Sequence, residues 1–254
     1  MMPSPPASPP GGLDVLHLDD FLVAVNKPAG LLVHRSEIDR HETHFALQMV
    51  RDLLGRRVFP VHRLDKPTAG VLLFALDPGT ARMMSDLFTA GGIAKTYLAV
   101  VRGLCPAADV IDHPLREEDD DRGGHADPDR PPQSAITSYR RLATVELPFP
   151  SGPHPTSRYS LVELQPRTGR RHQLRRHMKH IFHPIIGDTT HGDGRHNALF
   201  RREFDSARLL LAAVRFGFVH PHTGQALEIR APLDAGFQSL LARFGWIDED
   251  SPTA

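Results

Sequence analysis

The chain is poor in the features that mark secreted and membrane proteins. It has one cysteine, Cys105, among 254 residues, which excludes a disulfide framework and a cysteine-rich zinc module and is typical of a reducing compartment. Its longest apolar runs, 71–76 and 209–214, are far shorter than the roughly 20 residues that cross a bilayer. The chain also opens without the basic and then apolar pattern of a secretory signal. We therefore expect a cytoplasmic protein without a membrane partner.

Net charge and internal repeats are also missing. The 30 basic residues balance the 30 acidic ones, and 40% hydrophobic content is typical of a folded globular chain. Residues 1–12 contain five prolines and predict a disordered leader. Like charges, glycines and prolines predict an acidic surface loop over 116–133, and the tail at 248–254 looks frayed. Residues 13–247 are then left as a single domain.

Short apolar runs outnumber helical patterns along this domain. Helices are predicted over 43–54 with Thr43 as a cap, from Pro78 to Gly91 and Gly92, and over 170–181. Strands are predicted at 13–18, 21–26, 71–76, 93–101, 135–145, 158–165, 207–219 and 226–231. The helices are too few and too irregularly placed for repeated βαβ units. The pattern favours an α+β fold around a mostly antiparallel sheet.

Positive charge is concentrated in one segment. Residues 165–202 hold nine Lys or Arg residues and two acidic ones, a local charge of +7 in a neutral chain. On a helix, Arg171, Arg175 and Lys179 follow one another at i, i+4 and i+8. The apolar positions of that helix are Leu174, Met178 and Ile181. The cations form either a solvated face or a surface that follows the phosphates of a nucleic acid, and further cations in the flanking loops favour the second interpretation.

Histidines in the same segment raise the question of a metal. His177 and His180 could share a helical face, but no H-E-x-x-H pattern or nearby cysteine accompanies them, and we expect no metal site. Asp188 and His191 could suggest a hydrolase pair. Because no G-x-S-x-G elbow is present, a glycine-rich structural turn explains these two residues better.

An aspartate lies directly before the apolar run at 71–76. It is Asp65, in His62-Arg63-Leu64-Asp65-Lys66-Pro67-Thr68-Ala69-Gly70. A turn that leads into a central strand holds such a carboxylate rigidly, as a nucleophile or base requires. An aspartate that only caps the turn around Pro67 fits these residues equally well. The letters H-R-x-D also occur in kinases, but neither a glycine-rich phosphate loop nor D-F-G is present.

Four segments together resemble the RluA-type pseudouridine synthases. His62-Arg63-Leu64-Asp65 is similar to that family's H-R-L-D signature, and 26–30 with Val33-His34 to its N-terminal motif. Residues 95–97 (K-T-Y) and 167–175 (R-T-G-R-R-H-Q-L-R) match two further motifs in the family's order. The resemblance extends from about residue 13 to 246. Within the family, 33–42, 139–148 and 183–193 most resemble the tRNA pseudouridine synthase C branch, which modifies uridine 65 of certain tRNAs.

The resemblance implies a fold, a reaction and a set of site residues. The fold is a mixed, mostly antiparallel central sheet flanked by helices and loops, with a catalytic cleft across the sheet. Asp65 would be the catalytic residue, Tyr97 would lie against the flipped uracil, and Arg175 would pair with Asp65. RNA contacts are expected at His62, Arg63, Arg170, Arg171, His172 and Lys179. The expected partner is RNA, specifically tRNA, bound by a monomer without a metal or nucleotide cofactor.

Alternative interpretations stay open at this stage. Tyr97 could only pack its ring, and Arg175 could contact only a phosphate. The same chemistry could act on ribosomal RNA, or the chain could bind RNA without catalysis. A metal-dependent hydrolase is the most distant alternative.

Overall fold

The computed structural model describes residues 13–34, 44–118, 127 and 129–247. The predicted leader, the frayed tail and the middle of the acidic loop lie outside the described residues, as does Thr43. The described chain divides into two compact units. A single domain over 13–247 stays a prediction.

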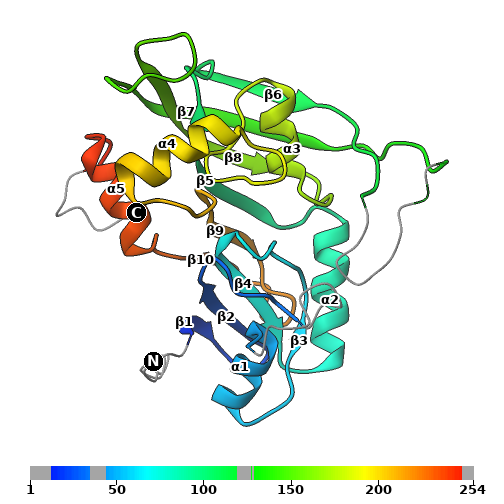
Figure 1. Ribbon diagram of the computed structural model, residues 1–254. Coiled ribbons are helices and arrows are strands. Elements are labelled where there is room, and N and C mark those ends of the chain that lie inside the picture. The colour runs from blue at the N-terminus through cyan, green and yellow to red at the C-terminus, as the bar shows by residue number, and fades with distance from the viewer. Residues whose placement is uncertain (1–12, 35–43, 119–126, 128, 248–254) are drawn as a thin grey trace. The chain divides into compact units, whose positions relative to one another are not determined.

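The first unit is drawn from Met1–Lys95, Glu118–Ala126 and Ala213–Pro232. Its strands are β1 (Asp14–Leu18), β2 (Leu22–Lys27), β3 (Phe59–Pro60), β4 (Ala69–Ala75), β9 (Leu211–Val219, which the unit includes from Ala213) and β10 (Ala226–Arg230), and its helices are α1 (Ala46–Leu54) and α2 (Pro78–Thr89) (Figure 1). In sheet order β1, β2, β4 and β9 follow one another. β1 pairs with β2, β2 and β3 with β4, and β10 with β9, all antiparallel.

β4 forms the centre of this unit. All seven of its residues are buried, as are the first four of β2, which explains why both strands read as continuous apolar runs. Gly70 begins the apolar stretch with φ +110°, and a Cβ there would lie 2.1 Å from the carbonyl oxygen of Ala213. Only glycine allows that approach. The turn that carries Asp65 therefore ends at a fixed point of the sheet.

The two helices of the first unit follow ordinary capping rules to different degrees. α2 has Asp77 as its N-cap, whose side chain accepts a hydrogen bond from the backbone N–H of Thr80 at 2.9 Å, and Pro78 follows in the first turn. α2 packs against β4 and β3. α1 begins after Phe45, which makes no side-chain cap bond, and ends at Gly55 with φ 62°. The helix predicted over 43–54 is confirmed from Ala46 to Leu54, and the N-cap position is occupied by Phe45.

The second unit is drawn from Thr96–Glu117, Asp127–Ala212 and Leu233–Ala254. Its elements are β5 (Ala94–Arg102, which the unit includes from Thr96), β6 (Ala108–Asp112), β7 (Ile136–Leu147), β8 (Ser157–Pro166), α3 (Gln173–His180), α4 (Gly194–Phe204) and α5 (Ala235–Arg243) (Figure 1). The strand order is β5, β8, β7, β6, and each neighbouring pair is antiparallel. α3 lies against β8.

A cluster of buried apolar side chains joins α3 to this sheet. Leu174 and Met178 of α3 belong to it, and Ile181 packs against it, which confirms the predicted apolar positions of that helix. Cys105 belongs to the same cluster. Burial raises the pKa of the Cys105 thiol to about 11, so the sole cysteine does not supply a thiolate nucleophile at neutral pH.

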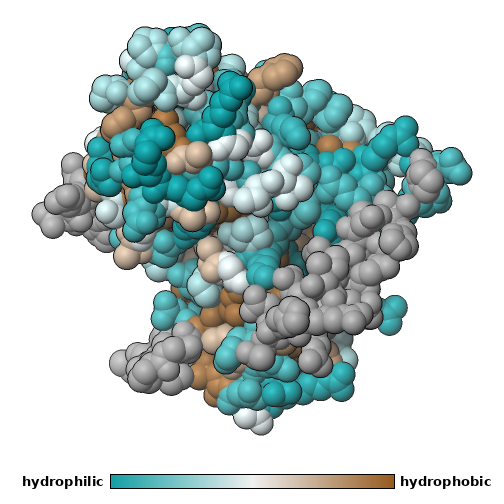
Figure 2. Space-filling view, in the orientation of Figure 1, coloured by the Kyte–Doolittle hydropathy of each residue, from teal (hydrophilic) through white to brown (hydrophobic). Residues whose placement is uncertain are grey.

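The α+β prediction with mostly antiparallel strands is confirmed. Four elements were not predicted: β3, β6, α4 and α5. The strand expected from residue 207 begins at Leu211. Among the described residues, no helix is long and apolar enough to cross a membrane. On the face shown in Figure 2, hydrophilic residues cover most of the surface and hydrophobic ones are scattered between them.

Candidate active site

Asp65 lies in a short turn that leads directly into β4. The backbone N–H of Thr68 donates to the carbonyl oxygen of Asp65 at 3.0 Å and closes the turn around Pro67. Thr68 and Ala69 are buried, whereas Asp65 is partly exposed. A rigid turn next to a buried strand thus holds a partly exposed aspartate, as a reacting group requires.

Lys27, at the end of β2, ties this turn to the neighbouring one. Its side chain is fully buried, and its Nζ donates to the carbonyl oxygens of Pro28 (3.0 Å), Leu31 (2.8 Å) and Lys66 (3.1 Å). The N–H of Gly30 also donates to the carbonyl oxygen of Lys66 at 2.8 Å. The 26–30 motif therefore has a physical role, because its lysine fixes the loop next to Asp65.

Replacing Lys27 by methionine should destabilise the first unit. Lys27→Met keeps the volume but leaves the carbonyl oxygens of Pro28 and Leu31 without the ammonium, at about 1–3 kcal/mol each. Urea unfolding should show this loss. Lys179→Met, an exposed lysine of α3, is the stability control and should unfold like the wild type. Unchanged unfolding of Lys27→Met would contradict this role.

His62 serves the fold of the same loop. Its Nε2 accepts a hydrogen bond from the backbone N–H of Leu73 at 3.0 Å, and its ring lies against Phe88 and Phe216. Burial, with the nearby charge of Lys95, lowers the pKa of His62 to about 3, so the ring is neutral at pH 7 with its proton on Nδ1. An RNA contact by His62 stays a prediction, and it would be a neutral one.

Arg63 and Leu64 alternate between exposed and buried positions, as residues of a loop at the edge of a hydrophobic core do. Leu64 is buried and Arg63 is exposed. The exposure of Arg63 is compatible with the predicted RNA contact, which stays a prediction.

The 167–175 motif is held to β7 by a chain of hydrogen bonds. Gln173 Oε1 accepts from Thr168 Oγ1 (2.7 Å) and from the N–H of Arg170 (3.0 Å), and its Nε2 donates to Thr137 Oγ1 (3.0 Å). Thr137 Oγ1 also lies 2.9 Å from Nδ1 of His177, whose Nε2 lies 3.0 Å from the carbonyl oxygen of His113. Since a carbonyl only accepts, Nε2 of His177 carries the proton and Nδ1 accepts from Thr137.

This network settles the state of His177. Burial lowers the pKa of His177, with a further contribution from nearby cations, and the buried ring is neutral. Both of its nitrogens are engaged in hydrogen bonds, so His177 cannot at the same time bind a metal with His180.

Arg175 forms a buried ion pair with Asp188. Its Nε donates to Asp188 Oδ2 at 2.7 Å and its Nη2 to Asp188 Oδ1 at 2.8 Å, and the two side chains are 5% and 0% exposed. Asp188 Oδ1 also accepts the backbone N–H groups of Thr190 (2.9 Å) and His191 (2.8 Å). The turn at 187–192 is therefore a cradle for the guanidinium.

Glycines make this cradle possible. Gly187 has φ +80°, and a Cβ at Gly192 would lie 2.0 Å from the carbonyl oxygen of Asp188. The predicted glycine-rich structural turn around Asp188 and His191 is confirmed, but sequence reasoning missed the ion pair. The signal lay in Gly187-Asp188-Thr189-Thr190, because an aspartate at the start of a turn accepts backbone N–H groups from the residues that follow.

The predicted line of three cations on one helical face is wrong. α3 begins at Gln173, so Arg171 lies in the turn before the helix. Arg175 is buried and paired with Asp188, and only Lys179 of the three is exposed on the helix. Periodicity placed Arg175 with the exposed cations because a buried ion pair leaves no hydrophobic signal in the sequence.

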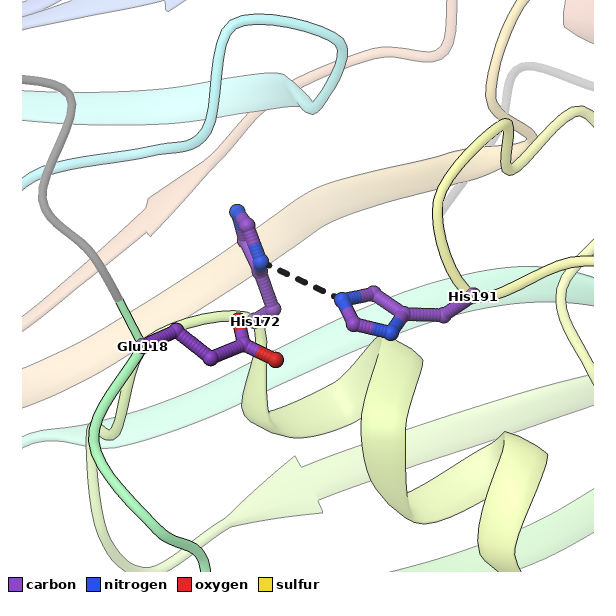
Figure 3. A group of neighbouring side chains, drawn as sticks. All are labelled: Glu118, His172 and His191. Carbon is purple, nitrogen blue, oxygen red and sulfur yellow. Dashed lines mark hydrogen bonds between the residues drawn. The ribbon is translucent and has the colours of Figure 1, made fainter. Parts of the chain in front are cut away.

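His172 precedes α3 in a left-handed backbone conformation. Its φ is 51°, and its Nδ1 lies 3.2 Å from Nε2 of His191, as Figure 3 shows. One of these two nitrogens must carry a proton and donate the hydrogen bond, and the other must be unprotonated and accept it. The turn before α3 and the cradle of Arg175 are thus joined at a second point.

Tyr97 lies on β5, opposite Leu164 of β8. It is partly exposed and packs against the apolar cluster that includes Leu174 and Met178. Its ring therefore has the packing role considered for it, and a role at a uracil stays a prediction.

The predicted site residues fall into two groups. His62, Arg63 and Asp65 belong to the first unit, and the others belong to the second: Tyr97, Arg170, Arg171, His172, Arg175 and Lys179. Arg170 and Lys179 are exposed, and Arg171 and His172 are partly buried. The pairing of Arg175 with Asp65 stays a prediction.

Comparison with known proteins identifies the family. The family model described as RNA pseudouridylate synthase matches residues 21–180, more than half of the chain. The chain belongs to this family. Two curated relatives, from Vibrio cholerae (54% identical, 92% of this chain and 96% of the relative) and Haemophilus influenzae (49%, 92% and 98%), are each named tRNA pseudouridine synthase C.

Solved structures agree with this assignment. The human RNA Pseudouridylate Synthase Domain Containing 4 has a TM-score of 0.69 at 28% identity, covering 91% of this chain and 93% of its own. Domain Containing 1 has a TM-score of 0.66 at 23% identity, covering 96% and 97%, and supports the fold. The resemblance found in the sequence is confirmed, and the protein is an enzyme of the isomerase class.

Proposed function

We propose that this pseudouridine synthase converts a uridine of tRNA into pseudouridine, with uridine 65 as the target. The observation that carries the proposal is identity of about one half, over nearly the full length of both chains, to relatives named tRNA pseudouridine synthase C. The turn geometry supports a reactive Asp65, because this partly exposed residue lies on a rigid loop that leads into a buried strand.

The reaction needs only groups that this chain carries. The bond from N1 to C1′ of the uridine breaks, a bond from C5 to C1′ forms, the proton of C5 leaves, and N1 gains a proton. Atoms and electrons balance without a redox step. Asp65 acts as an ionised nucleophile or stabilises the charge that develops at the sugar, after the base has left its stack. Tyr97 lies against the uracil and relays a proton.

Arg175 keeps Asp65 ionised and oriented in this proposal. Asp188 holds one edge of the guanidinium through two hydrogen bonds, so that the group is oriented before any ligand binds. An opposite charge within about 4–6 Å favours the ionised carboxylate. The two hydrogen bonds from Arg175 to Asp188 support a positioning role for Arg175 better than a phosphate contact, because a phosphate contact does not require a buried guanidinium.

Contacts with the RNA backbone come from the basic segment. Its exposed cations include Arg170 and Lys179, and its two acidic residues are both paired, Asp188 with Arg175 and Asp193 with Arg102. Apart from Arg175, whose charge Asp188 balances, the segment keeps exposed cations that face solvent. Such a surface binds phosphates and offsets the cost of extruding the target base.

Tritium release tests the activity. An unmodified tRNA transcript with tritium at C5 of its uridines should release one tritium per molecule, and a transcript with cytidine at position 65 should release none. Mapping of pseudouridine in the product should place it at position 65. Tritium release from ribosomal RNA and not from tRNA would overturn the assignment of tRNA as the substrate. Tritium release from neither RNA would overturn the proposed function.

A further inference from the structure

Phe182 is the most exposed large apolar side chain among the described residues. It is 79% exposed, compared with 57% for Val219 and 49% for Val110. The side chain follows α3 directly, in the middle of the basic segment. Its packing in the folded chain does not explain why an aromatic residue stands there.

The backbone of Phe182 makes the choice of residue more unusual. Its φ is 65°, in the left-handed region, where a bulky residue is strained. The N–H of Phe182 donates to the carbonyl oxygen of Lys179 (3.0 Å), and the N–H of His183 donates to that of Met178 (2.8 Å). These two bonds form a Schellman motif with Phe182 at the position that glycine usually occupies. Stability alone would favour glycine here.

Basic residues lie close to Phe182 in the chain, and a further one, Arg102, contacts its backbone. Lys179 and His180 are exposed on the last turn of α3. Arg102 donates through Nη2 to the carbonyl oxygen of Phe182 (3.0 Å) and through Nη1 to Asp193 (2.6 Å), so the nearby acid is paired. Protein-docking patches are contiguous apolar areas of several hundred Å², whereas the chain neighbours of Phe182, Ile181 and His183, are both partly buried and Ile181 packs against the core. An isolated aromatic next to cations is typical of a platform for an unstacked nucleotide.

We propose that Phe182 stacks on an unpaired base of the RNA substrate while Lys179 contacts an adjacent phosphate. This inference rests on the proposed function, and it adds a contact that fixes the RNA on the second unit. A strained residue at a ligand site is tolerated when the ligand contact outweighs the strain. Every base has a π-face, so the contact contributes affinity and orientation with little base preference.

Phe182→Gly separates the two roles of the residue. Relief of the left-handed strain should raise the unfolding midpoint by about 2–4 °C. Loss of the ring should weaken tRNA binding by about 5- to 150-fold, with the slope of affinity against salt unchanged because no charge is lost. Phe182→Trp should keep affinity within about twofold, and its added fluorescence should be quenched by tRNA. Val219→Ala, another exposed apolar truncation, is the control and should bind like the wild type.

Three results would overturn the inference. These are wild-type tRNA affinity in Phe182→Gly, a lower unfolding midpoint in that variant, and a change in self-association measured by sedimentation with no change in RNA affinity. The proposed function fails by a different result, since it requires wild-type protein that releases no tritium from tRNA. The two failures are therefore distinguishable.

Discussion

Asp65→Asn should reduce tritium release from tRNA by at least about a thousandfold while tRNA affinity stays within a few fold of the wild type. The substitution keeps the shape of the side chain and removes only its charge and nucleophilicity. Removal of a nucleophile that acts in the transition state lowers kcat without a matching change in ground-state binding. Single-turnover tritium release and filter binding on the same preparations measure the two quantities.

The turn around Asp65 should survive this substitution. Its closing bond, from the N–H of Thr68 to the carbonyl oxygen of Asp65, is a backbone bond. The unfolding midpoint of Asp65→Asn therefore tests whether the protein is intact. Asp86→Asn, on the exposed surface of α2 in the same unit, is the matched control and should turn over normally. Retained turnover by Asp65→Asn would end the assignment of this carboxylate.

The fold was predictable wherever buried positions appear in the sequence as an apolar run or as a regular apolar spacing. β2 and β4 are buried over most of their length, so they appear as apolar runs, and the core face of α3 follows from the spacing of Leu174 and Met178. β6 was missed because four of its five residues are exposed. It has almost no apolar alternation to detect.

The missed helices carried signals that were not used. α4 begins after Asp193 and α5 after Asp234, and both aspartates accept hydrogen bonds from backbone N–H groups as N-caps. In α5, Phe237, Leu240 and Leu241 are buried with helical spacing. α4 is harder to predict, because Gly194, His196 and Asn197 are weak helix formers and its burial depends on tertiary packing.

The candidate site was predictable as a set of motifs and not as a set of contacts. Asp65 was found because the motif and the turn chemistry coincide. Neither Lys27 nor Asp188 was assigned a role, since both act by binding buried polar groups that come from other segments. Hydrophobic periodicity carries no information about which charge is buried. A paired interior charge therefore escapes a search that is based on periodicity.

Asp188→Asn should destabilise the protein by about 3–5 kcal/mol at pH 7. The substitution removes the buried carboxylate charge that faces the Arg175 guanidinium, and removal of one partner is the costly way to break an interior ion pair. An asparagine Nδ2 can also face the donors of Arg175, so that one of the two hydrogen bonds is lost. Asp193→Asn is the matched control, because Asp193 also pairs with an arginine but is 23% exposed and asparagine still caps α4. It should lose about 1 kcal/mol or less.

The difference in unfolding free energy between the wild type and Asp188→Asn should depend on pH. This dependence identifies the charge of Asp188 as the cause of the lost stability. Burial alone would raise the pKa of Asp188, but hydrogen bonds from Arg175, His191 and Thr190, with the charge of Arg175, lower it below its usual value of 3.8. A carboxyl group with a lowered folded pKa stabilises the protein above its unfolded pKa, and this stability is lost as pH falls through the folded pKa. The difference in unfolding free energy, measured by urea titration, should thus be constant from pH 7 to about 5 and shrink below about 4. A difference that stays constant down to pH 3 would mean that shape, and not charge, makes Asp188 necessary.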